Sequence, residues 1–124
     1  MMDQPSMLEI VDVVRTFLEQ RAMPELKGHT AFHARVAANA LGIVSRELKL
    51  GPEAAEKERA RLAALLGHDG PLADLNCELC RQIRDGGIGI DSAALARHLD
   101  ITTHDKVAID QPNYAGLRQA RSGA

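Results

Sequence analysis

The stretch from His29 to Leu50 reads HTAFHARVAANALGIVSRELKL and is the longest strongly patterned run in the chain. Its apolar residues cover most of a helical circumference: Val36, Ala37, Ala40, Leu41, Ile43, Val44 and Leu48. The remaining positions form a narrow stripe: Arg35, Asn39, Gly42, Arg46 and Lys49. A helix that is apolar over so much of its surface is expected to be buried on several sides. The pattern therefore predicts a central buried helix over residues 30–49, with other helices packed around it.

Helical patterns continue on both sides of this stretch. A 3–4 spacing of apolar residues predicts a first helix that begins near residue 5 and stops at Pro24. Gly51 is expected to end the central helix, and Pro52 to open a third one. Pro71 opens a fourth helix, and Ser92 caps a fifth. No strand-like alternation of useful length occurs, so we predict an all-α, single-domain bundle of about five helices over residues 1–116, followed by a flexible tail at 117–124.

Composition and charge exclude several classes of function. The 124 residues are 45% hydrophobic and 26% charged, which is ordinary globular usage. A net charge of −2 and an aromatic content of 2% provide neither a basic face nor stacking platforms for nucleic acid. The N-terminus lacks a secretory signal pattern, and no apolar run is long enough to span a membrane. We therefore expect a cytoplasmic protein that needs no cofactor and binds neither nucleic acid nor membranes.

One constellation has the residue types of a metal site: His33, the pair His68-Asp69, and Asp105 or Asp110. The runs HARVA and AALLGHDG around the histidines resemble the HD-domain metal-dependent phosphohydrolases. That resemblance implies a divalent ion that activates water and stabilises charge on a phosphate. The sequence GHDGP reads more naturally as an exposed turn between helices, with Asp69 or Gly70 as a cap for the next helix. We favour the turn, with no metal bound and no catalytic residue, and keep the phosphohydrolase as an alternative.

Two further groups of residues are weaker candidates for chemistry. Cys77 and Cys80 form a CxxC inside the predicted fourth helix, without the second pair that a zinc site requires. We expect both cysteines to pack in the core as small hydrophobic residues. His98 and His104 lie six residues apart, which is not helical i,i+4 spacing, and are expected at the surface.

Polar residues of the central helix provide a candidate contact surface. Arg35, Asn39 and Arg46 lie along one side, where two guanidinium groups and an amide suit a carboxylate, a phosphate or an acidic partner surface. A solvated or internally paired helix face explains them equally well. Gly42 lies in the same stripe and marks a place where a helix or a ligand approaches the backbone closely, if it is not merely tolerated.

The end of the chain carries a specific cluster: Asp110, Pro112, Asn113 and Tyr114. We predict a structural role for this motif. Tyr114, the only tyrosine, is expected to fold back on the bundle. Asp110 and Asn113 are expected to satisfy the polar groups at the helix terminus.

Four runs together resemble a known family: FHARVAANALGIVSREL, ERARLAALLG, LNCELCRQIRDG and KVAIDQPNYAG. The family consists of short bacterial proteins classed as a domain of unknown function, and the similarity extends over about residues 7–116. Its members tend to be encoded near aminoglycoside-phosphotransferase-like kinases and acyl-CoA dehydrogenases. The resemblance implies an accessory role in acyl-CoA or fatty-acid metabolism.

Three hypotheses follow for function. The favoured one is a non-catalytic helical accessory module that binds a protein partner, either a kinase-like or an acyl-CoA enzyme, and forms a homodimer. The second is the HD-domain-like metal-dependent phosphohydrolase. The third is a small anionic-ligand-binding protein that uses the stripe of Arg35 and Arg46.

Overall fold

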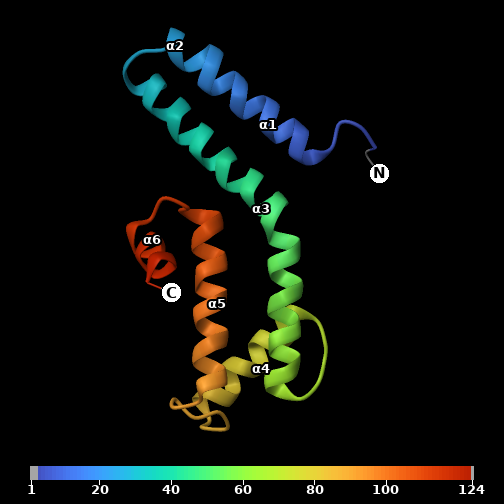
Figure 1. Ribbon diagram of the computed structural model, residues 1–124. Helices are drawn as coiled ribbons and strands as arrows, with labels where there is room; N and C mark the ends of the chain where they lie inside the picture. The colour runs from blue at the N-terminus through green and yellow to red at the C-terminus, as the bar shows by residue number, and fades with distance from the viewer. Residues whose placement is uncertain (1–2, 124) are drawn as a thin grey trace. The chain divides into compact units, whose positions relative to one another are not determined.

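The structure, a computed structural model of the chain, describes residues 3–123, and every regular element in that range is helical (Figure 1). The predicted all-α class is therefore confirmed. The elements are, in order, α1 (Met7–Phe17), the π-helical turn η1 (Leu18–Ala22), α2 (Met23–Glu25), α3 (Gly28–Leu66), α4 (Leu72–Arg84), α5 (Ala93–Asp110) and α6 (Ala115–Ser122). They form two compact units that divide between Leu50 and Gly51. None of these helices is long and apolar enough to cross a bilayer.

The first helix begins with a capping box. The Ser6 hydroxyl accepts from the Glu9 amide at 3.2 Å, and the Glu9 carboxylate accepts from the Ser6 amide at 2.7 Å. These reciprocal bonds satisfy amide groups that a helix start leaves without partners. Helical structure continues without interruption through η1 and Pro24 and ends at Glu25, so the predicted end of the first helix near Pro24 is confirmed.

Helix α3 continues through the predicted break at Gly51-Pro52. The prediction of two separate helices is wrong: α3 starts at Gly28 and runs 39 residues, with Pro52 inside it. Gly51 is not among the glycines with positive φ in the described range, so it does not adopt the left-handed terminal conformation. Good helix formers follow the proline, and Lys57 pairs with Glu53 one turn apart at 2.6 Å. These helix-favouring interactions compensate for the helix-breaking tendency of Pro52.

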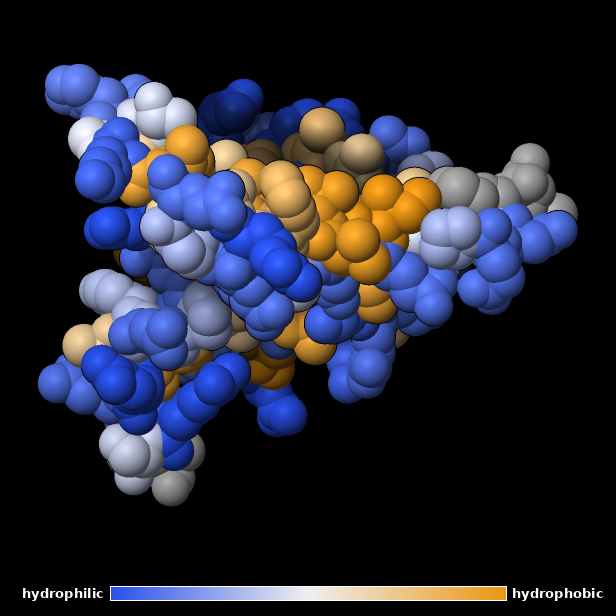
Figure 2. All heavy atoms as spheres, turned by 90° about the horizontal axis from the view of Figure 1, so that it is seen from above, coloured by the Kyte–Doolittle hydropathy of each residue, from blue (hydrophilic) through white to orange (hydrophobic). Residues whose placement is uncertain are grey.

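The N-terminal unit is a helical hairpin, in which α1 and the first half of α3 lie side by side and run in opposite directions (Figure 1). The buried positions within residues 3–50 carry small side chains: Ala38, Gly42 and Ser45. The predicted burial of residues 30–49 on several sides is not observed. Since this part of α3 has one neighbouring helix in its unit, Phe32, Val36 and Ile43 remain 36–56% exposed. Figure 2, which looks from above, shows an orange band of hydrophobic residues bordered by blue ones.

The C-terminal unit has a leucine core. It consists of Leu62 from α3, Leu75 and Leu79 from α4, and Leu95 from α5. Leu75 and Leu79 are four residues apart, so they share one face of α4. The predicted cap of the fifth helix is confirmed, since the Ser92 hydroxyl accepts from the Leu95 amide at 3.2 Å.

The chain end forms a short helix within the range for which we predict a flexible tail. Helix α6 covers Ala115–Ser122, and the side chain of Leu117 is only 3% exposed. The flexibility of residues 117–124 stays a prediction, and residue 124 lies outside the described residues. A single leucine among small and polar residues gives a weak sequence signal, but its burial holds the last helix in place.

Replacing Pro52 by alanine tests the continuity of α3. Proline inside a helix removes one backbone hydrogen bond and costs up to about 3 kcal/mol relative to alanine. Because Pro52 is exposed, Pro52→Ala loses no packing and should raise the thermal midpoint measured by circular dichroism. Pro71→Ala is the matched control, since Pro71 lies outside the helix at the N-cap of α4 and should change the midpoint little. A lower midpoint for Pro52→Ala would contradict an uninterrupted helix.

Candidate functional site

A buried serine joins the two helices of the hairpin. The Ser45 hydroxyl donates to Asp12 Oδ1 at 2.7 Å, and Lys49 Nζ lies 3.5 Å from Asp12 Oδ2. The Ser45 hydroxyl, with a smaller contribution from Lys49, holds the pKa of Asp12 below its usual value. The hydroxyl is 1% exposed and has its hydrogen-bond partner, so this contact sets the register of α1 on α3.

The predicted stripe on α3 divides between solvent and the hairpin interior. Arg35 and Asn39 are exposed, while Arg46 is half-buried. A Cβ atom at Gly42 would lie 3.3 Å from Nη1 of Arg46 and 3.7 Å from Nη1 of Arg15. Gly42 therefore makes room for the guanidinium groups of Arg46 and Arg15. These two groups occupy the space beside Gly42 in which a ligand could approach the backbone. Ligand binding by the stripe stays a prediction.

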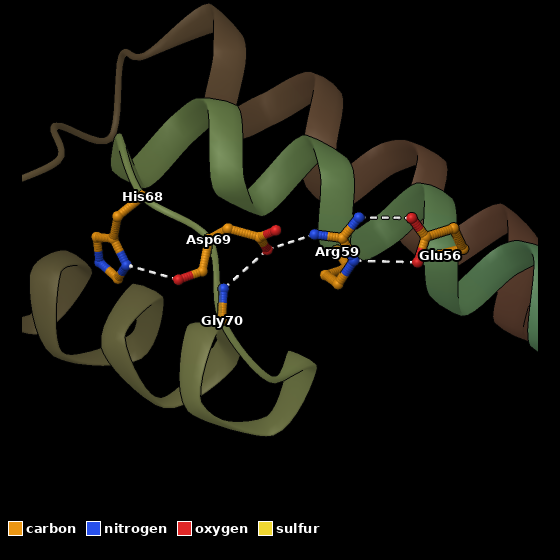
Figure 3. Close-up of polar contacts among 5 residues, drawn as sticks. All are labelled: Glu56, Arg59, His68, Asp69 and Gly70. Carbon is orange, nitrogen blue, oxygen red and sulfur yellow. Dashed lines mark hydrogen bonds and ion pairs between the residues drawn. The ribbon is translucent and has the colours of Figure 1, made fainter.

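The GHDGP segment forms the predicted exposed turn between α3 and α4, with Gly67 at φ +85°. In Figure 3 the Asp69 carboxylate accepts from the Gly70 amide at 2.8 Å and pairs with Arg59, which also binds Glu56. The Gly70 amide and then the Arg59 guanidinium lower the pKa of Asp69. Asp69 and Gly70 do not cap the following helix, because the N-cap of α4 is Pro71. The Asp69 side chain stabilises the turn.

His68 forms an ion pair in the same turn. Its Nε2 atom lies 2.6 Å from a carboxylate oxygen of Glu78, and Nδ1 donates to the Asp69 carbonyl at 3.4 Å. The carbonyl contact and then Glu78 raise the pKa of His68. Metal binding requires a neutral imidazole, so stabilising the protonated form opposes it.

The other proposed metal ligands lie on different elements. His33 is exposed in the N-terminal unit, where its ring meets Phe32 edge-on at 5.6 Å between centroids. Asp105 lies on α5, and Asp110 ends that helix. Within residues 3–123, no three His, Cys, Asp or Glu side chains are grouped so that they could hold a metal ion. The phosphohydrolase hypothesis therefore lacks an assembled ligand set in the described part of the chain.

Both cysteines are exposed and free, which corrects the predicted core role. Cys77 follows the buried Leu75 by two positions, and a two-residue step turns about 200° around a helix. Cys80 follows the buried Leu79 by one position and also points to the solvent side. The helical period thus places the leucines inward and the thiols outward.

The C-terminal motif forms the connection between α5 and α6. Asp110 is the last residue of α5, and Tyr114 is the N-cap of α6. The Tyr114 amide donates to the Gln111 carbonyl at 3.0 Å and closes the turn that contains Pro112 and Asn113. A Cβ atom at Gly116 would lie 2.5 Å from Tyr114 Cε1, so the tyrosine ring covers the first turn of α6. The ring is still 56% exposed.

A cavity that the sequence analysis did not identify lies between the second half of α3 and α5. His98, predicted at the surface, is only 3% exposed and faces this cavity of about 360 Å³, together with Arg61 and Arg97. Within the described residues, Nδ1 of His98 and Nε of Arg61 are buried without hydrogen-bond partners. Burial, and then the Arg61 charge, lower the pKa of His98, so the imidazole is neutral near pH 7.

The sequence carried a signal for the burial of His98. It follows Leu95 by three positions and precedes Thr102 by four, so it shares a face of α5 with a core leucine. The six-residue spacing between His98 and His104 carries no information about this shared face. The spacing to the leucine, not to the other histidine, decides which way the ring points.

Comparison with known proteins identifies one family. The family described as "Domain of unknown function (DUF6285)" matches residues 24–114, a region that contains all of α3, α4 and α5. No curated protein and no solved structure matches the chain.

The paired state of His68 gives a test by NMR titration. Glu78→Gln removes the carboxylate, so the pKa of His68 should fall toward its ordinary value of about 6.5. Because the folded-state pKa is raised, the pair stabilises the protein below pH 6.5 and loses this effect as pH rises through the raised pKa. The midpoint difference between wild type and Glu78→Gln should therefore be larger at low pH. Asp100→Asn, beside His104, is the control, and an unchanged His68 pKa in Glu78→Gln would contradict the pairing.

Ser45→Ala tests the contact between the hairpin helices. The variant should have a lower thermal midpoint than wild type at pH 7, because Asp12 loses its hydroxyl donor. The depressed pKa of Asp12 stabilises the fold above its ordinary value of 3.8, and this effect is lost as pH falls through the folded-state pKa. The two midpoints should therefore converge below that value. Ser122→Ala, on the exposed end of α6, is the control and should match wild type throughout. A midpoint difference that does not depend on pH would contradict the role of Asp12.

Proposed function

Because the chain belongs to the DUF6285 family, whose function is unknown, its own surfaces have to indicate its role, and we propose a helical interaction module that pairs with a second copy of itself. The observation that supports this is the exposed apolar surface of the N-terminal hairpin. Ten large hydrophobic side chains there are 36–68% exposed: Met7, Ile10, Val13, Val14 and Phe17 before the turn, and Phe32, Val36, Ile43, Val44 and Leu50 after it.

These side chains form stripes, as expected from helical spacing. Met7, Ile10 and Val14 recur at intervals of three and four, so they share one face of α1. Phe32, Val36 and Ile43 recur at intervals of four and seven and share a face of α3. The orange band in Figure 2 is bordered by blue residues, which is the arrangement of an interface core with a polar rim.

The hairpin has little core of its own. Its buried residues, Ala38, Gly42 and Ser45, together bury few apolar atoms. The larger apolar residues of the hairpin, such as Val11 and Leu41, are only partly buried. The hairpin therefore gains less from the hydrophobic effect, which is proportional to the apolar area removed from water. Covering the exposed stripes would supply the missing burial.

The area of the exposed apolar surface and the net charge of the hairpin favour a second copy of the chain as the partner that buries this surface. The ten side chains expose on the order of 1,000 Å², comparable with the roughly 800 Å² that each partner buries in a stable interface. Residues 1–50 contain six Lys or Arg and six Asp or Glu, so two hairpins carry no net charge that would repel. A two-fold axis would bring the two hairpins together as a four-helix bundle.

The family resemblance predicts further partners. A kinase-like or acyl-CoA enzyme, and a link with acyl-CoA metabolism, stay predictions. The same apolar face would suit a helix of such an enzyme, and this is one outcome that the test of self-association distinguishes.

Sedimentation equilibrium over about a hundredfold range of protein concentration tests the proposal. Wild type should dimerise, and Val14→Asp should weaken the dimer at least about tenfold, because an unpaired charge would be buried at the interface. Ile90→Asp is the matched control: Ile90 is 99% exposed in the C-terminal unit, and its substitution should leave the dimer unchanged.

The alternatives give distinct results. A wild-type protein that stays monomeric throughout would overturn self-association. A dimer that persists in Val14→Asp, with helix content unchanged by circular dichroism, would place the interface elsewhere and also overturn the proposal.

A further inference from the structure

The cavity between α3 and α5 lies wholly within the C-terminal unit and has the size of a small-ligand site. Its volume is about 360 Å³, within the roughly 300–1,000 Å³ typical of ligand pockets. Three of its lining side chains carry nitrogen donors, namely Arg61, Arg97 and His98. The others are apolar: Ala64, Leu65, Ala94 and Ile101. A few convergent polar groups in an apolar wall are the usual composition of a binding pocket.

Two of the polar groups are buried without partners. His98 is only 3% exposed, and its Nδ1 atom lacks a hydrogen bond among the described residues. Nε of Arg61 is likewise buried and unpaired, although Nη2 of the same side chain donates to Thr102 Oγ1 at 3.1 Å. Buried polar atoms are nearly always hydrogen-bonded, because leaving them unpaired is unfavourable. Nε of Arg61 is a donor, and Nδ1 of His98 is a donor in the tautomer that carries its proton there, so the two atoms beside one cavity fit a ligand that supplies acceptors.

The charge of the cavity specifies the kind of ligand. Arg61 and Arg97 each carry a positively charged guanidinium group. The acidic group that affects the pKa of His98 is Glu58, and its carboxylate accepts from the Asn76 amide at 3.1 Å. The arginines therefore leave an excess of positive charge at the cavity. Guanidinium groups bind carboxylate and phosphate oxygens through parallel hydrogen bonds.

We propose that this cavity binds a small organic anion. Its carboxylate or phosphate group accepts hydrogen bonds from Arg61, Arg97 and the His98 imidazole. Its apolar part packs against Leu65, Ala94 and Ile101. The site is independent of the hairpin surface, so either proposal can fail without the other.

NMR titrations of the full-length protein test the site with three probes. Hexanoate and butyl phosphate carry the two anionic groups, and hexanamide is the neutral analogue of hexanoate. We expect saturable shifts of the Arg61 and His98 side-chain signals with at least one anion below about 10 mM, and none with hexanamide. The anion that binds identifies the headgroup. The absence of binding by both anions, or equal binding of hexanamide, would overturn the proposal.

Variants separate binding from packing. Arg97→Gln should weaken anion binding about tenfold and leave the fold intact, because Arg97 is exposed. Arg84→Gln, on the exposed side of α4, is the matched control and should bind like wild type. An unchanged affinity in Arg97→Gln would overturn the assigned contacts.

His98→Leu gives a readout that a purely structural histidine would not. The substitution removes an unpaired buried nitrogen, so the thermal midpoint without ligand should rise by a few degrees, about 4 °C. The increase in midpoint that the anion produces in wild type should be lost. A lower thermal midpoint of His98→Leu without ligand, together with an anion-induced increase in midpoint equal to that of wild type, would show that His98 only stabilises the fold. That result would overturn its role in binding.

Discussion

The continuity of α3 is the constraint on which both units depend. Helix α1 packs on its first half, and α4 and α5 pack on its second half, so one helix forms part of both units. The side chains that face those neighbours differ greatly in size. The first half offers Ala38 and Ser45, which allow close approach but bury little apolar area, whereas the second half inserts Leu62, which is fully buried. This difference leaves the hairpin with an uncovered apolar surface and gives the C-terminal unit its core.

Two buried polar side chains show opposite solutions to the same physical problem. Ser45 is removed from water and is paired with Asp12, so it holds two helices in register. His98 is removed from water as completely, yet one of its nitrogens has no partner in the described structure. A satisfied buried group is explained by the fold alone. The unsatisfied one beside two arginines is better explained by a molecule that the fold accommodates.

The His68-Asp69 turn illustrates why a short motif does not establish a catalytic site. The residue types are those of a metal site, but Arg59 and Glu78 already provide charged partners for both side chains. Those partners lie ten residues away on α3 and α4, and only the folded chain brings them to the turn. The contacts of His68 favour its protonated form, and that form is incompatible with metal ligation.

The sequence by itself determined the all-helical class, the GHDGP turn, the start of α4 and the Ser92 cap, because each depends on neighbouring residues and on the helical period. Only the tertiary structure decided that Val36 and Ile43 stay exposed and that Leu117 anchors a final helix. Those outcomes depend on what packs against each residue, and local propensity carries no information about that. The burial of His98 stands between the two: its spacing from Leu95 indicated the direction of the ring, but the cavity and the arginines around it required α3 and α5 to be brought together.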